Sequence, residues 1–259
     1  RGLGDVYKRQ LLDLAIGYGE RLLGLATRSD DGWSWKTMEM PVRHDLTGLA
    51  HGAAGIAWSL LELAQATGEP AFQAGGSEGL RYVRRWFSPE HQNWPDFRNL
   101  HQPKADYDDT PTYSVTWCHG APGIGMALLR AAQITGDPAY GAEAEAAIQT
   151  TLAALDRQPT GREDWSLCHG SAGNAELLLL ARDVAGRAAS SSPERLGALG
   201  RERYDETHTP WPCGVPGGGE APNLMLGTAG IGYSYLRLYD PARVPSVLLS
   251  PAPGYRRPS

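Results

Sequence analysis

Apolar residues recur at helical spacing in two matching stretches of the chain. The run that follows Gly55, IAWSLLELAQATGEP, places Trp58, Leu61 and Leu63 close to one helical face. The run that follows Gly123, IGMALLRAAQITGDP, has the same pattern. Both runs end in Thr-Gly-acid-Pro, and a glycine past the last turn with a proline soon after it is a helix stop signal. The pattern therefore predicts two helices that are structural copies of each other.

Less apolar stretches alternate with these two runs. The segments 11–26, LLDLAIGYGERLLGLA, and 140–155, YGAEAEAAIQTTLAAL, have the composition of helices that pack by one face only. Strand signals are weak, and the one β-branched run of note is VPSVLL at 244–249. We therefore expect an all-α fold in which a pair of helices is the repeating unit.

A short glycine phrase opens both of these apolar runs and occurs four times in the chain, as HGAAGIA, HGAPGIG, HGSAGNA and GTAGIG. The first glycines of the four phrases are Gly52, Gly120, Gly170 and Gly227. Glycines three apart permit close approaches forbidden to other residues, and they leave amide donors accessible at a helix N-terminus. Tight packing of helices alone would also explain the first glycine. The repeats predict that several helix N-termini converge on one point.

Composition narrows the functional classes. The chain has 259 residues, enough for one large domain or two modest ones. Its 24 basic and 29 acidic side chains give a net charge of −5, without the basic excess that nucleic-acid binding requires. No apolar run approaches the roughly 20 residues that span a bilayer, and three cysteines favour a reducing compartment. We expect a cytoplasmic protein with no membrane span and no nucleic-acid partner.

The first ten residues, RGLGDVYKRQ, match nothing that follows and carry charges where a signal peptide would be apolar. They resemble translated sequencing-adapter read-through joined to a gene fragment. We therefore leave residues 1–10 unassigned, as sequence that is not native to the protein, and place the domain at 11–259.

In two of the four phrases a cysteine directly precedes the first histidine, which gives the pairs Cys118-His119 and Cys168-His169. Thiolate and imidazole are preferred ligands of zinc, and two equivalent helix starts would bring two sulfurs and one nitrogen to one ion. Three protein ligands with an open fourth position are typical of catalytic zinc. The alternative is a packed thiol with a core histidine. Cys213 lies outside the pattern, in a stretch rich in proline and glycine that predicts a loop thiol.

In their longer context the four phrases resemble those of the lanthionine synthetase C-like (LanC-like) cyclases: GLAHGAAGIAWSLLELA, TWCHGAPGIGMALLRAA, SLCHGSAGNAELLLLA and PNLMLGTAGIGYSYLRLYDPARVPSVLL. The likeness is strongest to the C-terminal cyclase domain of class II (LanM-type) lanthipeptide synthetases, and it runs from about Leu11 to Pro251. It implies an α/α toroid whose inner helices begin around one zinc ion. Because a complete toroid has seven inner repeats, four repeats imply a partial toroid, the C-terminal part of a cyclase domain.

The resemblance also implies roles for single residues. Three of them match the family's zinc ligands, namely Cys118, Cys168 and His169. His51 matches a histidine proposed as acid/base catalyst. His119 stands where synthetase-linked cyclases carry histidine, so it is the second catalytic candidate. The fourth phrase has neither cysteine nor histidine and is expected to be scaffold.

The reaction implied by the resemblance is the zinc-dependent formation of lanthionine and methyllanthionine in lantibiotic biosynthesis. A cysteine thiol of a precursor peptide adds to dehydroalanine or dehydrobutyrine in the same peptide. The dehydrated precursor peptide is therefore the expected partner. We also expect an N-terminal dehydratase domain in the full-length protein, and the family's D-x-x-S-G turn before Leu11.

Two rival functions stay open at this point. Glycoside hydrolases also use the α/α toroid and work with two carboxylates, and Asp106, Asp108 and Asp109 form an acidic cluster. Three acids within four residues beside Pro111 instead favour an exposed loop. The second rival is a non-catalytic helical module that holds zinc and binds peptide, or an inactive fragment.

Overall fold

The computed structural model describes residues 3–39, 44–98, 111–157, 164–185, 192–217 and 219–249. Its elements are α1 (Leu3–Leu25), β1 (Thr27–Ser29), β2 (Gly32–Ser34), α2 (Ala53–Thr67), α3 (Pro70–Arg85), α4 (Ala121–Thr135), α5 (Pro138–Leu155), α6 (Ser171–Ala185), α7 (Ser192–Gly200), the π-helical turn η2 (Arg201–Asp205) and α8 (Thr228–Tyr239). None of the helices in these ranges is both long and apolar enough to cross a bilayer.

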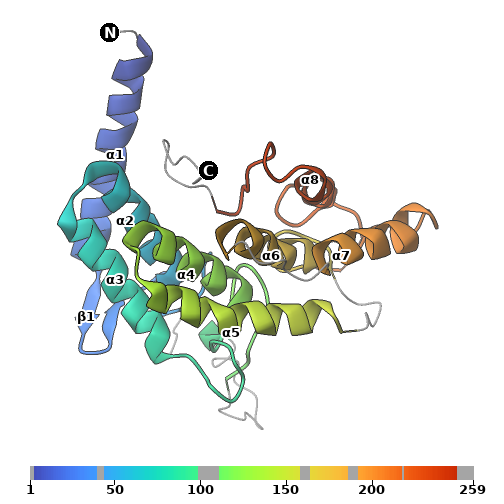
Figure 1. Cartoon of the computed structure of the whole chain (residues 1–259), viewed down its shortest axis with the longest axis horizontal. Helices are drawn as coiled ribbons and strands as arrows, with labels where there is room; N and C mark the ends of the chain where they lie inside the picture. Colours follow the sequence, from blue (N-terminus) through green and yellow to red (C-terminus); the bar gives the residue numbers. More distant parts are fainter. Residues whose placement is uncertain are drawn as a thin grey trace.

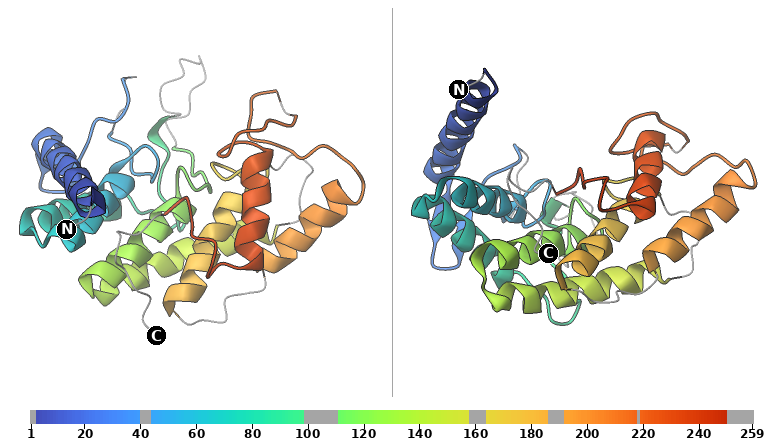
Figure 2. Two further views of the ribbon diagram at one scale, coloured as in Figure 1. Left: turned by 90° about the horizontal axis from the view of Figure 1, so that it is seen from above. Right: turned by 45° about the horizontal axis from the view of Figure 1, so that its top comes forward.

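The helices form two curved rows (Figures 1 and 2). In the inner row α2 contacts α4, α4 contacts α6, and α6 contacts α8. In the outer row α3 packs on α2, α5 on α4, and α7 on α6. Both copied helices end in a left-handed glycine, at Gly68 and at Gly136, as the stop signals predict. The prediction of helix pairs as the repeating unit is confirmed.

Two features differ from the sequence-based expectations. The helix expected from Leu11 begins at Leu3, so it includes residues that we left unassigned; their foreign origin stays a prediction. A two-stranded antiparallel hairpin pairs Thr27 with Ser34, and its strands of three residues are too short for a periodic signal. As the weak strand signals indicate, the segment 244–249 forms no strand, and its Leu248 and Leu249 are buried in the helical core.

Buried ion pairs fix neighbouring inner helices to each other. Arg130 of α4 forms a two-pronged pair with Glu62 of α2, with Nη2 3.0 Å from Oε2. Arg237 of α8 forms the same kind of pair with Glu176 of α6, at 2.9 Å and 3.1 Å. Two parallel hydrogen bonds set orientation as well as distance. The pairs therefore help to orient α2 relative to α4 and α6 relative to α8.

Candidate metal centre

The N-termini of the inner helices meet through a repeated main-chain contact. In the first three phrases, the residue two positions before the first glycine donates its N–H to the equivalent carbonyl of the next phrase. The three bonds run from Ala50 to Cys118 (3.3 Å), from Cys118 to Cys168 (3.0 Å) and from Cys168 to Met225 (2.9 Å). The four glycine turns therefore lie side by side in one row, and the predicted convergence is confirmed.

The second glycine of each phrase leaves no room for a side chain. A Cβ at these positions would lie 1.9 to 2.0 Å from the carbonyl oxygen six residues earlier, at Gly55, Gly123, Gly173 and Gly230. That carbonyl belongs to the same turn, so the turn itself requires glycine, independently of helix packing. The first amides of α2, α6 and α8 each donate to a carbonyl seven residues earlier. The sequence suggested that these amides would be accessible to a ligand, and in the structure they are not.

The three predicted ligands lie together at the centre of this row. Cys118, Cys168 and His169 each offer one ligand atom, and these atoms lie within 4.8 Å of one another. Zinc–sulfur bonds of about 2.3 Å at tetrahedral angles put two sulfurs roughly 3.8 Å apart. Cys118 is buried, Cys168 is partly exposed and His169 is exposed, so the cluster opens to solvent on the histidine side. The residues present fit one zinc ion.

Cys168 favours the ionisation of Cys118, whereas Cys118 opposes the ionisation of Cys168. A hydrogen bond from Cys168 lowers the pKa of Cys118 to about 6 against the desolvation that burial imposes, and Thr116 and Arg98 add to the lowering. The pKa of Cys168 is raised, first by its hydrogen bond to Cys118 and then by burial. The pair thus holds one thiolate readily and resists the second, which a divalent cation would stabilise.

Two oxygen atoms orient the imidazole of His169 through its Nε2 atom. Its Nε2 lies 3.1 Å from the carbonyl oxygen of Gly214 and 3.3 Å from Oδ2 of Asp164. A carbonyl only accepts, so Nε2 carries the proton and Nδ1 keeps the lone pair that a metal needs. The neighbouring Cys213 is buried and lies outside the ligand cluster, in the loop that its sequence predicts.

His119 occupies the same register as His169 but is buried, whereas His169 is exposed. The imidazole of His119 is completely buried, with Nε2 3.4 Å from Oδ1 of Asp96. Burial lowers the pKa of His119 to about 4, although Asp96 raises it, so the ring is neutral near pH 7. Gly120 has a φ of +95°, whereas Gly52 and Gly227 are extended. This difference in the backbone accompanies the burial of the preceding residue, His119. The second catalytic candidate therefore lies in the wall behind Cys118.

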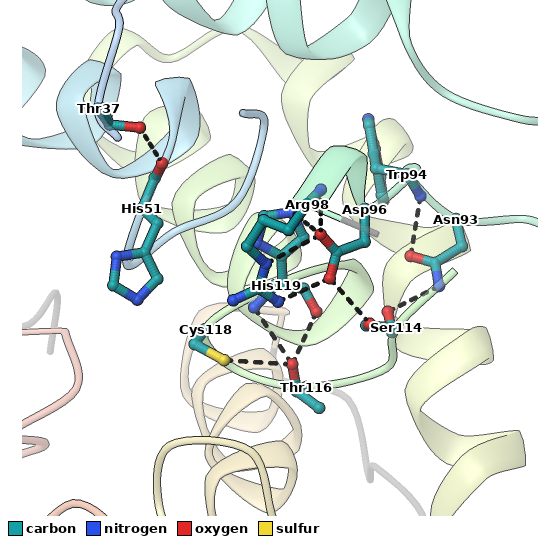
Figure 3. A network of polar contacts seen from close by, with 10 residues as sticks. All are labelled: Thr37, His51, Asn93, Trp94, Asp96, Arg98, Ser114, Thr116, Cys118 and His119. Carbon is teal, nitrogen blue, oxygen red and sulfur yellow. Dashed lines mark hydrogen bonds and ion pairs between the residues drawn. The ribbon is translucent and has the colours of Figure 1, made fainter. Parts of the chain in front are cut away.

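His51, the first catalytic candidate, is exposed beside the row of turns. Its backbone carbonyl accepts a hydrogen bond from the hydroxyl of Thr37, while its imidazole extends away from the chain (Figure 3). It lines a pocket of about 300 Å³ that Leu49 and Trp58 also border. Its charge lowers the pKa of His119, which adjoins Cys118 in the chain. Solvent therefore reaches His51 and does not reach His119.

A buried carboxylate that we did not predict joins the wall of the site (Figure 3). Asp96 accepts hydrogen bonds from Nε and Nη2 of Arg98, at 2.9 Å and 2.6 Å, and from Oγ of Ser114 at 3.2 Å. Burial opposes its ionisation, yet the hydrogen bonds from Arg98 and the charge of His119 hold its pKa below the usual value. The segment 93–98 has no repeat or periodic pattern, so the sequence carried no signal for it.

The rival acidic cluster, Asp106, Asp108 and Asp109, lies outside the described residues.

Comparison with known proteins now decides the family. The family model described as lanthionine synthetase C-like protein matches residues 3–249. The chain belongs to the lanthionine synthetase C-like family. The solved structure of nisin cyclase superposes on this LanC-like chain with a TM-score of 0.63 at 16% sequence identity, over 89% of this chain and 58% of that one. The fold is therefore the α/α toroid, as predicted.

A curated relative of this LanC-like chain is glutathione S-transferase LANCL1 of Danio rerio. It is 28% identical over 136 residues, which make up 51% of this chain and 29% of the relative. The chain therefore spans less than two thirds of the length of either protein.

Proposed function

We propose that this LanC-like chain is a zinc-dependent lanthionine cyclase of the class II type, which acts on a dehydrated precursor peptide. The observation that carries the proposal is the meeting of Cys118, Cys168 and His169 within 4.8 Å at the start of the inner helices. The class II type is supported by His119 after the first ligand cysteine. Because the ligand thiols must stay reduced, the proposal also places the protein in the cytoplasm.

The chain's own residues build an open site. Cys118, Cys168 and His169 would hold the metal, and Gly214 and Asp164 would keep the imidazole in the ligating tautomer. Zinc held by three protein ligands supplies a fourth position that favours the thiolate form of a bound thiol. In the described part of the chain no further cysteine, histidine or carboxylate belongs to the cluster, so that position is left for substrate.

The reaction is an addition that balances without a co-reactant. The peptide thiol loses its proton, its sulfur forms a bond to Cβ of the dehydro residue, and the Cα–Cβ π pair moves to give an enolate. Protonation at Cα completes the thioether. His51 is the proton donor in this proposal, because imidazole moves protons readily near neutral pH and this ring is exposed at the site. The burial of His119 argues against the same role for it.

The test uses a synthetic peptide that carries one dehydroalanine and one cysteine, with mass spectrometry after thiol alkylation. We expect about one equivalent of zinc in the parent protein and loss of the free thiol from the peptide. His51→Asn keeps the zinc and loses ring closure, whereas Cys168→Ala loses the zinc as well. Cys213→Ala is the control and leaves both unchanged.

Three results would contradict the proposal. One is zinc binding by the Cys168→Ala variant with the affinity of the parent. Another is a folded parent that binds the peptide and forms no thioether, which favours the non-catalytic peptide-binding module. The third is preferential addition of glutathione to the dehydroalanine, which would replace the cyclase by an intermolecular transferase.

A further inference from the structure

An arginine is clamped beside the candidate metal centre by an ion pair with tight geometry. The guanidinium of Arg98 donates from Nε and Nη2 to the two carboxylate oxygens of Asp96, and the backbone N–H of Arg98 donates to Oδ1 at 3.0 Å. Two parallel hydrogen bonds from a planar group fix its plane and direction. Because the backbone N–H of Arg98 also donates to Asp96, the local backbone helps to fix the position of the ion pair.

The carboxylate is in turn attached to the turn that carries Cys118. Asp96 is only 2% exposed and contacts Oγ of Ser114 and the ring of His119. Its backbone N–H donates to the carbonyl of Thr112 at 2.8 Å. The ion pair is therefore held at a set place relative to the ligand turn (Figure 3).

The guanidinium keeps hydrogen-bonding capacity. It has five N–H groups, and Asp96 engages one on Nε and one on Nη2. Within the described ranges, the hydrogen bonds of the guanidinium go to Asp96 alone, which leaves three N–H groups for a ligand. The Arg98 side chain is 30% exposed, unlike the buried Arg130 and Arg237. It is held through Asp96 against His119, which follows the candidate ligand Cys118 in the chain.

We propose that Arg98 is a catalytic residue of the cyclisation, with its remaining N–H groups donating to the carbonyl oxygen of the dehydro residue, and that Asp96 positions it. This proposal rests on the proposed function. When the sulfur–Cβ bond forms, the π pair moves onto that carbonyl oxygen, which becomes an enolate oxygen. A preoriented cation at this oxygen stabilises charge that is absent from the ground state. The proton then arrives at Cα from the acid, so Arg98 gains and loses none.

The test compares Arg98→Gln and Arg98→Lys with the parent on the peptide that carries one dehydroalanine and one cysteine. Removing one oxyanion donor lowers kcat by about 100- to 1,000-fold in other enzymes, so we expect a fall in that range for Arg98→Gln. KM and zinc content stay close to the parent values. Arg98→Lys recovers part of kcat, because it restores the charge without the planar fork.

A matched control is available at a distance from the site. Arg182 makes a two-pronged pair with Glu194 at 2.6 Å and 3.0 Å and is 33% exposed, similar to Arg98. Arg182→Gln is expected to leave kcat unchanged. A spectroscopic readout separates coordination from catalysis: in cobalt-substituted protein, the peptide thiol still produces a sulfur-to-cobalt charge-transfer band in Arg98→Gln.

The positioning role of Asp96 is tested by a double-mutant cycle. If Asp96 acts through Arg98, Asp96→Asn lowers kcat in the parent and adds little in the Arg98→Gln background. Additive losses overturn the positioning role.

Other outcomes overturn the role of Arg98. A kcat for Arg98→Gln within threefold of the parent overturns it, as does loss of zinc or of the cobalt–thiolate band in that variant. If the parent itself forms no thioether, the proposed function and this proposal both fail, whereas an active parent with an equally active Arg98→Gln variant removes this proposal alone.

Discussion

A single methyl group at Gly214 is expected to displace the histidine ligand. The backbone of Gly214 lies outside the left-handed region, so alanine is compatible with its conformation. A Cβ there would lie 2.6 Å from Nε2 of His169 and 2.8 Å from Oγ of Ser166, whereas ordinary contacts of a Cβ begin at 3.4 Å. The imidazole of Gly214→Ala must therefore move by about 0.8 Å, which exceeds the tolerance of about 0.2 Å for a metal–ligand distance.

The expected size of the effect follows from the role of Gly214 behind the ligand. Disturbing the partner that orients a ligating histidine lowers metal affinity by about 10- to 100-fold, which corresponds to about 1.4 to 2.8 kcal/mol. Competition with a chromogenic chelator measures the zinc affinity. Thermal unfolding of the metal-free protein checks that the fold is intact.

Gly232→Ala is the matched control, because its Cβ would meet nothing within 4 Å in α8. We expect unchanged zinc affinity and a small gain in stability of about 0.5 to 1 kcal/mol for this variant. Parent-like zinc affinity in folded Gly214→Ala would refute the orientation that we derive for His169.

Two further predictions concern ionisable groups. Glu176→Ala leaves Arg237 buried without its partner and should lower the free energy of unfolding by about 3 to 5 kcal/mol in urea titrations, whereas Glu194→Ala at an exposed pair should change it by less than about 1 kcal/mol. In metal-free protein, alkylation of Cys118 by iodoacetamide should have its midpoint near pH 6, and Cys168→Ser should move that midpoint upward. Because the folded pKa of Cys118 is lowered, its ionisation stabilises the fold above the ordinary thiol pKa of about 8.5, and this contribution disappears as the pH falls through about 6. A midpoint near the ordinary thiol value would contradict the coupling of the two thiols.

Repetition is what made the architecture predictable from the sequence. The glycine phrases and the matching stop signals predicted the helix pairs, and the Cys-His pairs within equivalent phrases predicted which side chains meet. A repeated turn has one geometry, so equivalent positions come together once the turns do. The hairpin at Thr27–Ser34 belongs to no repeat, and it was missed for that reason.

The environment of the ligands was not predictable in the same way. Asp96 and Arg98 come from a segment without helical or strand periodicity, and Gly214 reaches His169 from a loop 45 residues further along the chain. His119 is buried, and the glycine after it, Gly120, has a φ of +95° that the shared letters of the phrases do not reveal. Such features depend on the path of irregular chain, which local patterns do not encode.

The main-chain hydrogen bonds between the four turns bear on how substitutions would change the candidate metal centre. Ala50 and Met225 occupy the register of Cys118 and Cys168, and peptide groups rather than side chains hold all four in line. A new donor atom at either end would therefore arrive already aligned with its neighbours. Cysteine in place of Met225 is expected to add a fourth protein ligand to the proposed zinc site, which would turn an open site into a closed one of the structural type.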